Sequence, residues 1–282
     1  MSDSMPAYLS VPPEKLGEGV PIKFRTCGDM QGVADDMARV ILELIEAARS
    51  EGRGATLIVP VGPVDQFPIL AERINQGRCD CRDVMFINMD EYLTPDDRWV
   101  PIDHPLSFRG FMNRKFYDRI DPRLAPRPQN RVFPDPADPQ AIARAIDRRG
   151  GVDACFGGIG INGHIAFNEP PEPGQSMPVE DFAALPTRVL SLSRETRTIN
   201  SVTVGGEISI VPNRAITVGM KEILGSRRLR FYCNRPWQRA VVRRVLHGPL
   251  TSACPASLLR THPNAELAVA DYVAELPDIQ LR

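Results

Sequence analysis

Apolar residues recur every three to four positions between residues 30 and 51, which is the spacing of a helix with one buried face. Asp29 precedes this stretch and is a residue type that caps helix N-termini, and Gly52 follows it as a typical stop. The pattern predicts an amphipathic helix whose buried face is formed by Val33, Met37, Val40, Ile41, Leu44 and Ile45.

Short apolar runs alternate with helical patterns along the rest of the chain. The runs end in glycine, proline or acidic residues, which is typical of buried parallel strands followed by a turn. Such an alternation predicts an α/β fold with a doubly wound, mostly parallel sheet. We expect strands at 56–61, 84–92 and 152–160, helices at 67–77, 105–120 and 139–150, an irregular proline-rich loop at 122–139, and mixed strand and helix pieces at 215–224, 228–233 and 266–276.

The first residues show neither pattern. Residues 1–21 are polar and rich in proline and glycine, without the basic start and apolar stretch of a secretory signal peptide. We expect a loosely attached extension there and a single domain over residues 22–282. No run of about 18 apolar residues occurs, so the sequence predicts no membrane-spanning helix.

Charge and cysteine content exclude several classes of function. The chain has 34 Lys and Arg against 35 Asp and Glu, a net charge of −1, whereas nucleic acids and anionic membranes require a basic surface. The six cysteines lack zinc-knuckle or redox spacing, which indicates reduced, buried thiols in a cytoplasmic protein and no metal site. Proline, with 27 residues, is about twice as frequent as usual and predicts many ordered loops.

Candidate chemistry lies where the predicted strands end, because open α/β sheets bind ligands beyond the carboxyl ends of their strands. Asp90 and Glu91 directly follow one apolar run. Neighbouring strand side chains face opposite ways, so one of the two carboxylates can enter a pocket and act as a general base. A helix cap or a solvated acid pair is the alternative interpretation.

A glycine-rich segment at 157–170 follows another predicted strand and places His164 between Asn162 and Glu169, next to Gly163. It does not continue G-x-G-x-x-G into a helix, and it lacks the spacing and lysine of a P-loop. A histidine beside a carboxylate suits proton transfer to a hydroxyl, because the carboxylate sets its pKa and its tautomer. A structural histidine is the alternative.

A third strand end lies at 59–66, where Val61 and Gly62 begin a strand-to-helix turn. A helix N-terminus in this place could bind an anion. However, Pro63 lacks one N–H donor, and Asp65 would repel an anion if it pointed inward. A plain helix start capped by Asp65 explains the segment equally well.

These segments together resemble the glucosamine-6-phosphate deaminase family. The string GHIAFNEP is highly specific, and it differs from the GHTASLFP-like string of the related 6-phosphogluconolactonases. The resemblance covers about residues 22–275. It is carried, in the family's order, by NMDEY, HPLSFRGFMNRKFYDRID, GGIGINGHIAFNEP, TRTINS, AITVGMKEIL and SLLRTHP.

The resemblance implies a fold like that of ribose-5-phosphate isomerase and the CoA transferases, as one catalytic domain over residues 22–282. It implies conversion of an amino-sugar phosphate to a ketose phosphate with release of ammonia and without metal or organic cofactor. The partner is a small-molecule amino sugar, not a nucleic acid or a membrane, and a homo-oligomer is compatible with the family.

Individual roles follow from the same resemblance. Asp90 resembles the base that moves a proton between C2 and C1. His164 resembles the group that opens the sugar ring, with Asn162 and Glu169 supporting it. Further substrate contacts are implied at Val61, Gly62, Glu91, Gly163 and Arg197.

The phosphate-binding positions depart from the family pattern. The family's T-G-G-T-P loop is replaced by residues 61–65, its arginine after N-S by Val202, and its later lysine by Gln238. Charge-assisted contacts to an anion contribute about 1.5–3 kcal/mol each, so these losses matter.

Two further positions also differ. Position 162 is Asn where several members have Asp, so more of the stabilisation of an imidazolium would fall on Glu169. Leu190 replaces a lysine of the family's allosteric site, whereas the arginine that accompanies this lysine in the family is retained as Arg188.

We therefore expect the proton-transfer residues to be retained and the head-group pocket to be altered, for an amino sugar with a free 6-hydroxyl or another anionic group such as a sulfonate. Arg235, Trp237 and Arg239 would supply a new head-group contact, unless they form a solvated basic helix start. Two rivals are lactone hydrolysis, which would not need NMDEY and NEP, and a non-catalytic sugar sensor, which predicts an attached DNA-binding domain.

Overall fold

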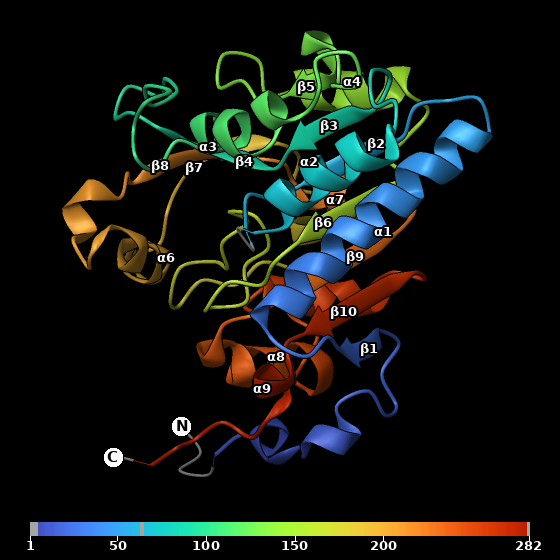
Figure 1. The fold of residues 1–282 in the computed structure, drawn as a ribbon. Coiled ribbons are helices and arrows are strands. Elements are labelled where there is room, and N and C mark those ends of the chain that lie inside the picture. Colours follow the sequence, from blue (N-terminus) through green and yellow to red (C-terminus); the bar gives the residue numbers. More distant parts are fainter. Residues whose placement is uncertain (1–4, 63–64, 281–282) are drawn as a thin grey trace.

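A seven-stranded sheet forms the centre of the computed structural model, which describes residues 5–62 and 65–280. Its strand order is β1-β10-β9-β6-β2-β3-β5, and every neighbouring pair is parallel (Figure 1). The prediction of a mostly parallel α/β sheet is thus confirmed. The strands are β1 (Lys23–Thr26), β2 (Thr56–Val59), β3 (Met85–Asn88), β5 (Arg131–Val132), β6 (Ala154–Gly157), β9 (Leu229–Cys233) and β10 (Ala265–Val269).

Two long helices, α1 (Met30–Ser50) and α2 (Gln66–Gly77), lie side by side across one face of this sheet (Figure 1). Asp29 caps α1 as predicted, because its carboxylate accepts a hydrogen bond from the Gly32 N–H at 2.9 Å. The predicted helix at 105–120 is shorter in the structure. The other helices are α3 (Phe108–Lys115), α4 (Ala141–Arg148), α5 (Val179–Ala183), α6 (Arg194–Ser201), α7 (Met220–Leu224), α8 (Arg239–His247) and α9 (Asp271–Ala274).

A second, antiparallel sheet has the order β4-β8-β7, formed by β4 (Asp90–Leu93), β8 (Arg214–Thr217) and β7 (Arg188–Ser191). The prediction of a single strand at 84–92 is therefore wrong, because this segment forms β3 and β4, which belong to different sheets. Met89 joins the two sheets, since its N–H donates to the Val59 carbonyl at 2.9 Å and its carbonyl accepts from the Val218 N–H at 2.8 Å. Asp90 is the first residue beyond this junction.

The described part of the N-terminal extension, residues 5–21, packs against α8, which corrects the expectation of a loosely attached segment. Leu16 has no exposed surface. Arg243, buried in α8, donates to the carbonyl oxygens of Val11 at 2.9 Å and Ala274 at 2.8 Å. The His247 Nε2 atom lies 3.0 Å from the Leu16 carbonyl. Helix α8 thus holds segments from both ends of the described chain.

The cysteines behave as their spacing predicts. All six are unpaired thiols, and all except Cys27 are buried. No helix within residues 5–62 and 65–280 is long and apolar enough to cross a lipid bilayer.

Candidate active site

The loop after β6 and the start of β4 meet at the end of β8. The Phe167 N–H donates to Thr217 Oγ1 at 3.0 Å, and Asn168 Nδ2 donates to the Val218 carbonyl at 2.9 Å. Thr217 is in turn the register partner of Asp90 in the small sheet. Asp90 and the loop that carries His164 therefore share one end of β8, at the carboxyl edge of the large sheet, where α/β folds bind ligands.

Asp90 is a buried carboxyl with no ion partner within residues 5–62 and 65–280. It is 7% exposed, and no hydrogen bond or ion pair reaches its carboxylate from any residue that the structure describes. Burial, together with the charge of neighbouring Glu91, raises the pKa of Asp90 well above its usual value. Such a carboxyl is suited to exchange a proton with a substrate carbon.

Glu91 faces the opposite way and binds the start of α3. Its carboxylate accepts hydrogen bonds from Ser107 Oγ at 3.0 Å and from the N–H groups of Phe108 and Arg109 at 2.9 Å. Arg109 Nε adds an ion pair at 3.1 Å. These bonds occupy the carboxylate of Glu91, which was predicted to contact substrate, so we assign it to holding β4 and Asp90 in place.

Asn162 fixes the orientation of His164. The amide donates from Nδ2 to Glu169 Oε2 at 2.8 Å, because a carboxylate can only accept. Its Oδ1 atom therefore faces His164 Nδ1 at 2.8 Å, which must carry the ring proton. The His164 Nε2 atom is left with a lone pair and can accept a proton from substrate.

Helix α6 completes this polar group with two residues that the sequence reasoning did not single out. Ser193, the N-cap, donates to Glu169 from its N–H at 3.2 Å and from Oγ at 3.1 Å. Thr196 Oγ1 lies 3.1 Å from His164 Nδ1. The direct distance from His164 Nδ1 to Glu169 Oε2 is 3.7 Å, too long for a hydrogen bond.

Two glycines shape the loop around His164. A Cβ atom on Gly160 would lie 2.0 Å from His164 Cε1 and 2.1 Å from Nε2, so the imidazole packs directly on the Gly160 backbone. Gly163 has a φ of 91°, and its carbonyl accepts from the Ala256 N–H at 2.8 Å. Burial lowers the pKa of His164, against the opposing charge of Glu169.

The other predicted substrate contacts have partners within the protein. Gln66 Nε2 donates to the Val61 carbonyl at 3.1 Å. Gly62 is exposed, while Pro63 and Val64 lie outside the described residues, so the predicted effect of Pro63 remains a prediction. The Arg197 side chain donates to the carbonyls of Val211 and Ile208, both at 3.3 Å.

The basic segment after β9 is also largely engaged. Arg239 Nε donates to the Tyr272 carbonyl at 2.7 Å, and its Nη2 pairs with Glu275. Gln238 Nε2 donates to the Ile159 carbonyl at 2.8 Å. Arg235 Nη1 lies 3.8 Å from Met30 Sδ, and Trp237 is partly exposed. Of the three residues expected to bind a head group, Arg239 is thus held by the C-terminal segment.

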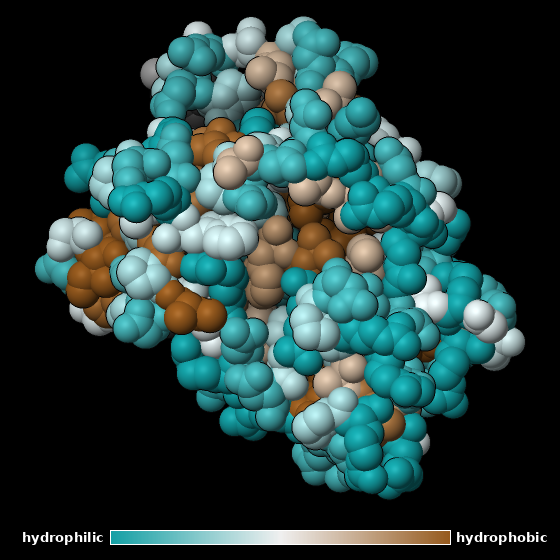
Figure 2. All heavy atoms as spheres, turned by 90° about the horizontal axis from the view of Figure 1, so that it is seen from above, coloured by the Kyte–Doolittle hydropathy of each residue, from teal (hydrophilic) through white to brown (hydrophobic). Residues whose placement is uncertain are grey.

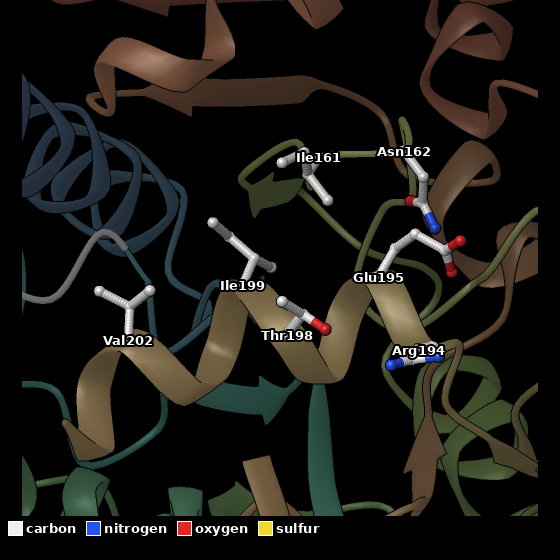
Figure 3. Close-up of a pocket in the computed structure, with 7 residues that line it drawn as sticks. All are labelled: Ile161, Asn162, Arg194, Glu195, Thr198, Ile199 and Val202. Carbon is white, nitrogen blue, oxygen red and sulfur yellow. The ribbon is translucent and has the colours of Figure 1, made fainter. Parts of the chain in front are cut away.

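A cavity of about 450 Å³ lies between the loop after β6 and α6. Figure 3 shows Ile161 and Asn162 facing this helix, with Glu195 and Ile199 directed toward them. Val202, which lines this cavity, is 70% exposed. Figure 2 shows apolar side chains gathered at the left and in the centre of the face seen from above. The charged lining groups are one guanidinium and one carboxylate. No three His, Cys, Asp or Glu side chains gather into a metal site in the described part of the chain.

Comparisons with known proteins agree with this geometry. The chain is 32% identical over 241 residues to the glucosamine-6-phosphate deaminase of Porphyromonas gingivalis, covering 83% of this chain and 85% of that one. It is 34% identical over 224 residues to the enzyme of the same name from Cellvibrio japonicus, covering 77% and 78% of the two chains. No family model matches the sequence.

Solved structures give the same result for the fold. A monomeric glucosamine-6-phosphate deaminase superposes with a TM-score of 0.76 at 26% identity, covering 91% of this chain and all of that one. The 6-phosphogluconolactonase from Trypanosoma cruzi superposes with a TM-score of 0.63 at 14% identity, a likeness of fold alone.

Proposed function

The chain belongs to the glucosamine-6-phosphate deaminase family, and we propose that it is an aldose–ketose isomerase that releases ammonia from an amino sugar. The observation that carries this proposal is the pair of proton-transfer groups at one sheet edge. Among the described residues, Asp90 is a buried carboxyl without an ion partner, and His164 is an imidazole whose Nε2 atom is free to accept a proton.

The first step is opening of the sugar ring by His164. Its Nε2 atom accepts the proton of the anomeric hydroxyl, the bond from C1 to the ring oxygen breaks, and the same proton passes from Nε2 to the ring oxygen. The imidazole suits this role because burial lowers its pKa and keeps the neutral form available at neutral pH.

The second step is proton transfer by Asp90. Its carboxylate removes the proton from C2 of the open-chain aldehyde, and the acid returns a proton to C1. An amino proton passes to O1 in the same step, so that a C1 hydroxyl and a C2 imine result. The resulting C2 imine is attacked by water and breaks down to a ketone and ammonia. Each such acid–base group typically contributes about 10²–10⁴-fold to the rate.

We propose further that the substrate carries an uncharged group at C6. C6 is bonded to C5, the carbon that also carries the ring oxygen, so the C6 group must lie on the side of the site where His164 opens the ring. The cavity beside Asn162 is lined by Ile161, Ile199 and Val202, and its charged residues balance each other. Gln238 and Arg239 are held by protein carbonyls. These features favour a hydroxyl over a phosphate or a sulfonate.

The test is an ammonia-release screen with glucosamine, glucosamine-6-phosphate and the corresponding 6-sulfonate, 6-deoxy-6-sulfoglucosamine. We expect the highest kcat/KM with glucosamine, and deuterium at C1 of the ketose when the reaction runs in D₂O. Val202→Arg should raise kcat/KM for glucosamine-6-phosphate about 10-fold or more, the effect of one charge-assisted contact.

Each part of the proposal fails on a different result. Absence of ammonia from all three sugars would refute the amino-sugar activity. Ammonia release by Asp90→Asn at the wild-type rate would refute the assignment of the base. A preference of the wild-type enzyme for glucosamine-6-phosphate would refute the uncharged C6 group and leave the reaction type intact.

A further inference from the structure

Five polar side chains form a closed ring of contacts around the proposed ring-opening group. His164 Nδ1 contacts Asn162 Oδ1 at 2.8 Å, and Asn162 Nδ2 donates to Glu169 Oε2 at 2.8 Å. The ring closes through α6. Glu169 Oε2 accepts from Ser193 Oγ at 3.1 Å, Ser193 Oγ lies 3.2 Å from Thr196 Oγ1, and Thr196 Oγ1 lies 3.1 Å from His164 Nδ1.

The α6 side of this ring has one consistent arrangement of protons. Glu169 can only accept, so the single hydroxyl proton of Ser193 points to it. The Thr196 hydroxyl then donates to Ser193 Oγ, and a lone pair on Thr196 Oγ1 shares the single His164 Nδ1 proton with Asn162 Oδ1, at 3.1 Å and 2.8 Å. The donors therefore run in one direction, from His164 through Thr196 and Ser193 to Glu169.

The Asn162 side cannot carry a proton in the same way. Its amide accepts from His164 at one end and donates to Glu169 at the other, but it has no proton that can pass between the two ends. The direct gap between His164 Nδ1 and Glu169 Oε2 is 3.7 Å. Among the described residues, the hydroxyls of Thr196 and Ser193 are thus the continuous path.

We propose that Thr196 and Ser193 relay a proton from His164 to Glu169 during the ring opening described under the proposed function, on which this inference rests. As Nε2 accepts the anomeric hydroxyl proton, the Nδ1 proton moves to Thr196 Oγ1, the Thr196 hydroxyl proton moves to Ser193 Oγ, and the Ser193 proton moves to the Glu169 carboxylate. At this point the imidazole is neutral, Glu169 is protonated, and both hydroxyls are restored. When Nε2 gives its proton to the ring oxygen, the relay runs in reverse and returns the proton of Glu169 to His164 Nδ1.

This relay avoids a charged imidazole in a buried position. His164 is 8% exposed, and Asn162 is neutral and cannot balance an imidazolium. Delivery of the charge to Glu169 cancels the negative charge that is already there. Thr196 and Ser193 act through His164 and are positioning residues that do not touch substrate.

Thr196→Val is the most direct test, because it removes one hydroxyl and keeps the side-chain shape. The variant should fold, since His164 Nδ1 keeps Asn162 Oδ1, and Ser193 Oγ keeps both Glu169 and the Thr196 N–H. Thr196→Ser restores the hydroxyl. Thr203→Val is the matched control, because the Thr203 hydroxyl contacts only the Asn200 carbonyl at 2.8 Å among described residues and is exposed.

The assay is ammonia release with glucosamine or glucosamine-6-phosphate, whichever the wild-type enzyme deaminates. We expect kcat of Thr196→Val to fall about 10- to 100-fold, the effect of one charge-assisted hydrogen bond, with KM unchanged. Thr196→Ser should recover most of kcat, and Thr203→Val should match wild type.

The relay is overturned if Thr196→Val keeps the wild-type kcat, or if the valine and serine variants lose activity equally, which would assign Thr196 a steric role. A wild-type enzyme without activity on either sugar is a different outcome, because it refutes the proposed function on which the relay depends.

Discussion

Gly160→Ala should remove most of the activity and leave the fold in place. The added Cβ would lie 2.0 Å from His164 Cε1, whereas ordinary contacts begin at 3.4 Å, so the imidazole must move by about 1.4 Å. A shift of that size breaks the 2.8 Å contact of Nδ1 with Asn162 and the 3.1 Å contact with Thr196. Misplacement by about 1 Å can cost 10²-fold, so we expect kcat/KM to fall about 100-fold or more.

The cost in stability should be smaller, about 1–3 kcal/mol for overpacking. Gly77→Ala is the matched control, because no atom lies within 4 Å of the added Cβ at the end of α2. Alanine favours a helix over glycine by roughly 1 kcal/mol, so this variant should be as active as wild type and no less stable. Ammonia release and urea unfolding measure the two effects. Wild-type kcat/KM in a folded Gly160→Ala protein would refute the packing of the imidazole on this glycine.

Three further variants test the electrostatics and the anchoring of the chain ends. Asp90→Asn should have a higher melting temperature than wild type at pH 7 and the same melting temperature at pH 3. Between the unfolded pKa of about 3.9 and the raised folded pKa, the native state holds a proton that the unfolded chain has lost, so the stability of the wild type falls as pH rises. Equal melting temperatures of the two proteins at both pH values would contradict this. Glu91→Gln should shift the acid limb of the pH–rate profile to lower pH, because it removes the charge that helps to raise the pKa of Asp90, and an unmoved limb would contradict the assignment. Arg243→Leu should cost about 3 kcal/mol or more in urea unfolding, since the carbonyls of Val11, Ala274 and Glu275 lose their donor, and a loss below about 1 kcal/mol would argue against this anchor.

The regular helices could be predicted because their burial is one-sided. The apolar face of α1 repeats at helical spacing, so its bounds at Met30–Ser50 follow closely from the sequence. The change of sheet at Met89 could not be predicted. All residues of β3 and β4 are buried, polar ones included, so no exposed position marks the change of sheet.

The same reasoning explains which site residues were found. Asp90 and His164 stand out as polar residues at the ends of apolar strands. Ser193 and Thr196 do not, because the buried face of α6 is polar and has no apolar period. Ser193 as an N-cap residue type was the one local signal for the start of this helix. Glu91 and Arg239 were predicted to contact substrate, but their side chains bind Arg109 and the Tyr272 carbonyl. Sequence spacing alone does not reveal these partners.

Because of the junction at Met89, the position of the proposed base Asp90 depends on two separate hydrophobic cores. Asp90 begins the small sheet, whose own core includes Val100, Leu192 and Val211, yet the preceding strand belongs to the large sheet. A cavity opened in the small core would tilt β4 while leaving the parallel sheet intact. The distance from the Asp90 carboxylate to a sugar carbon therefore depends on how the two sheets are packed against each other. Residues remote from any substrate can thus set the rate of proton transfer at C2 and C1.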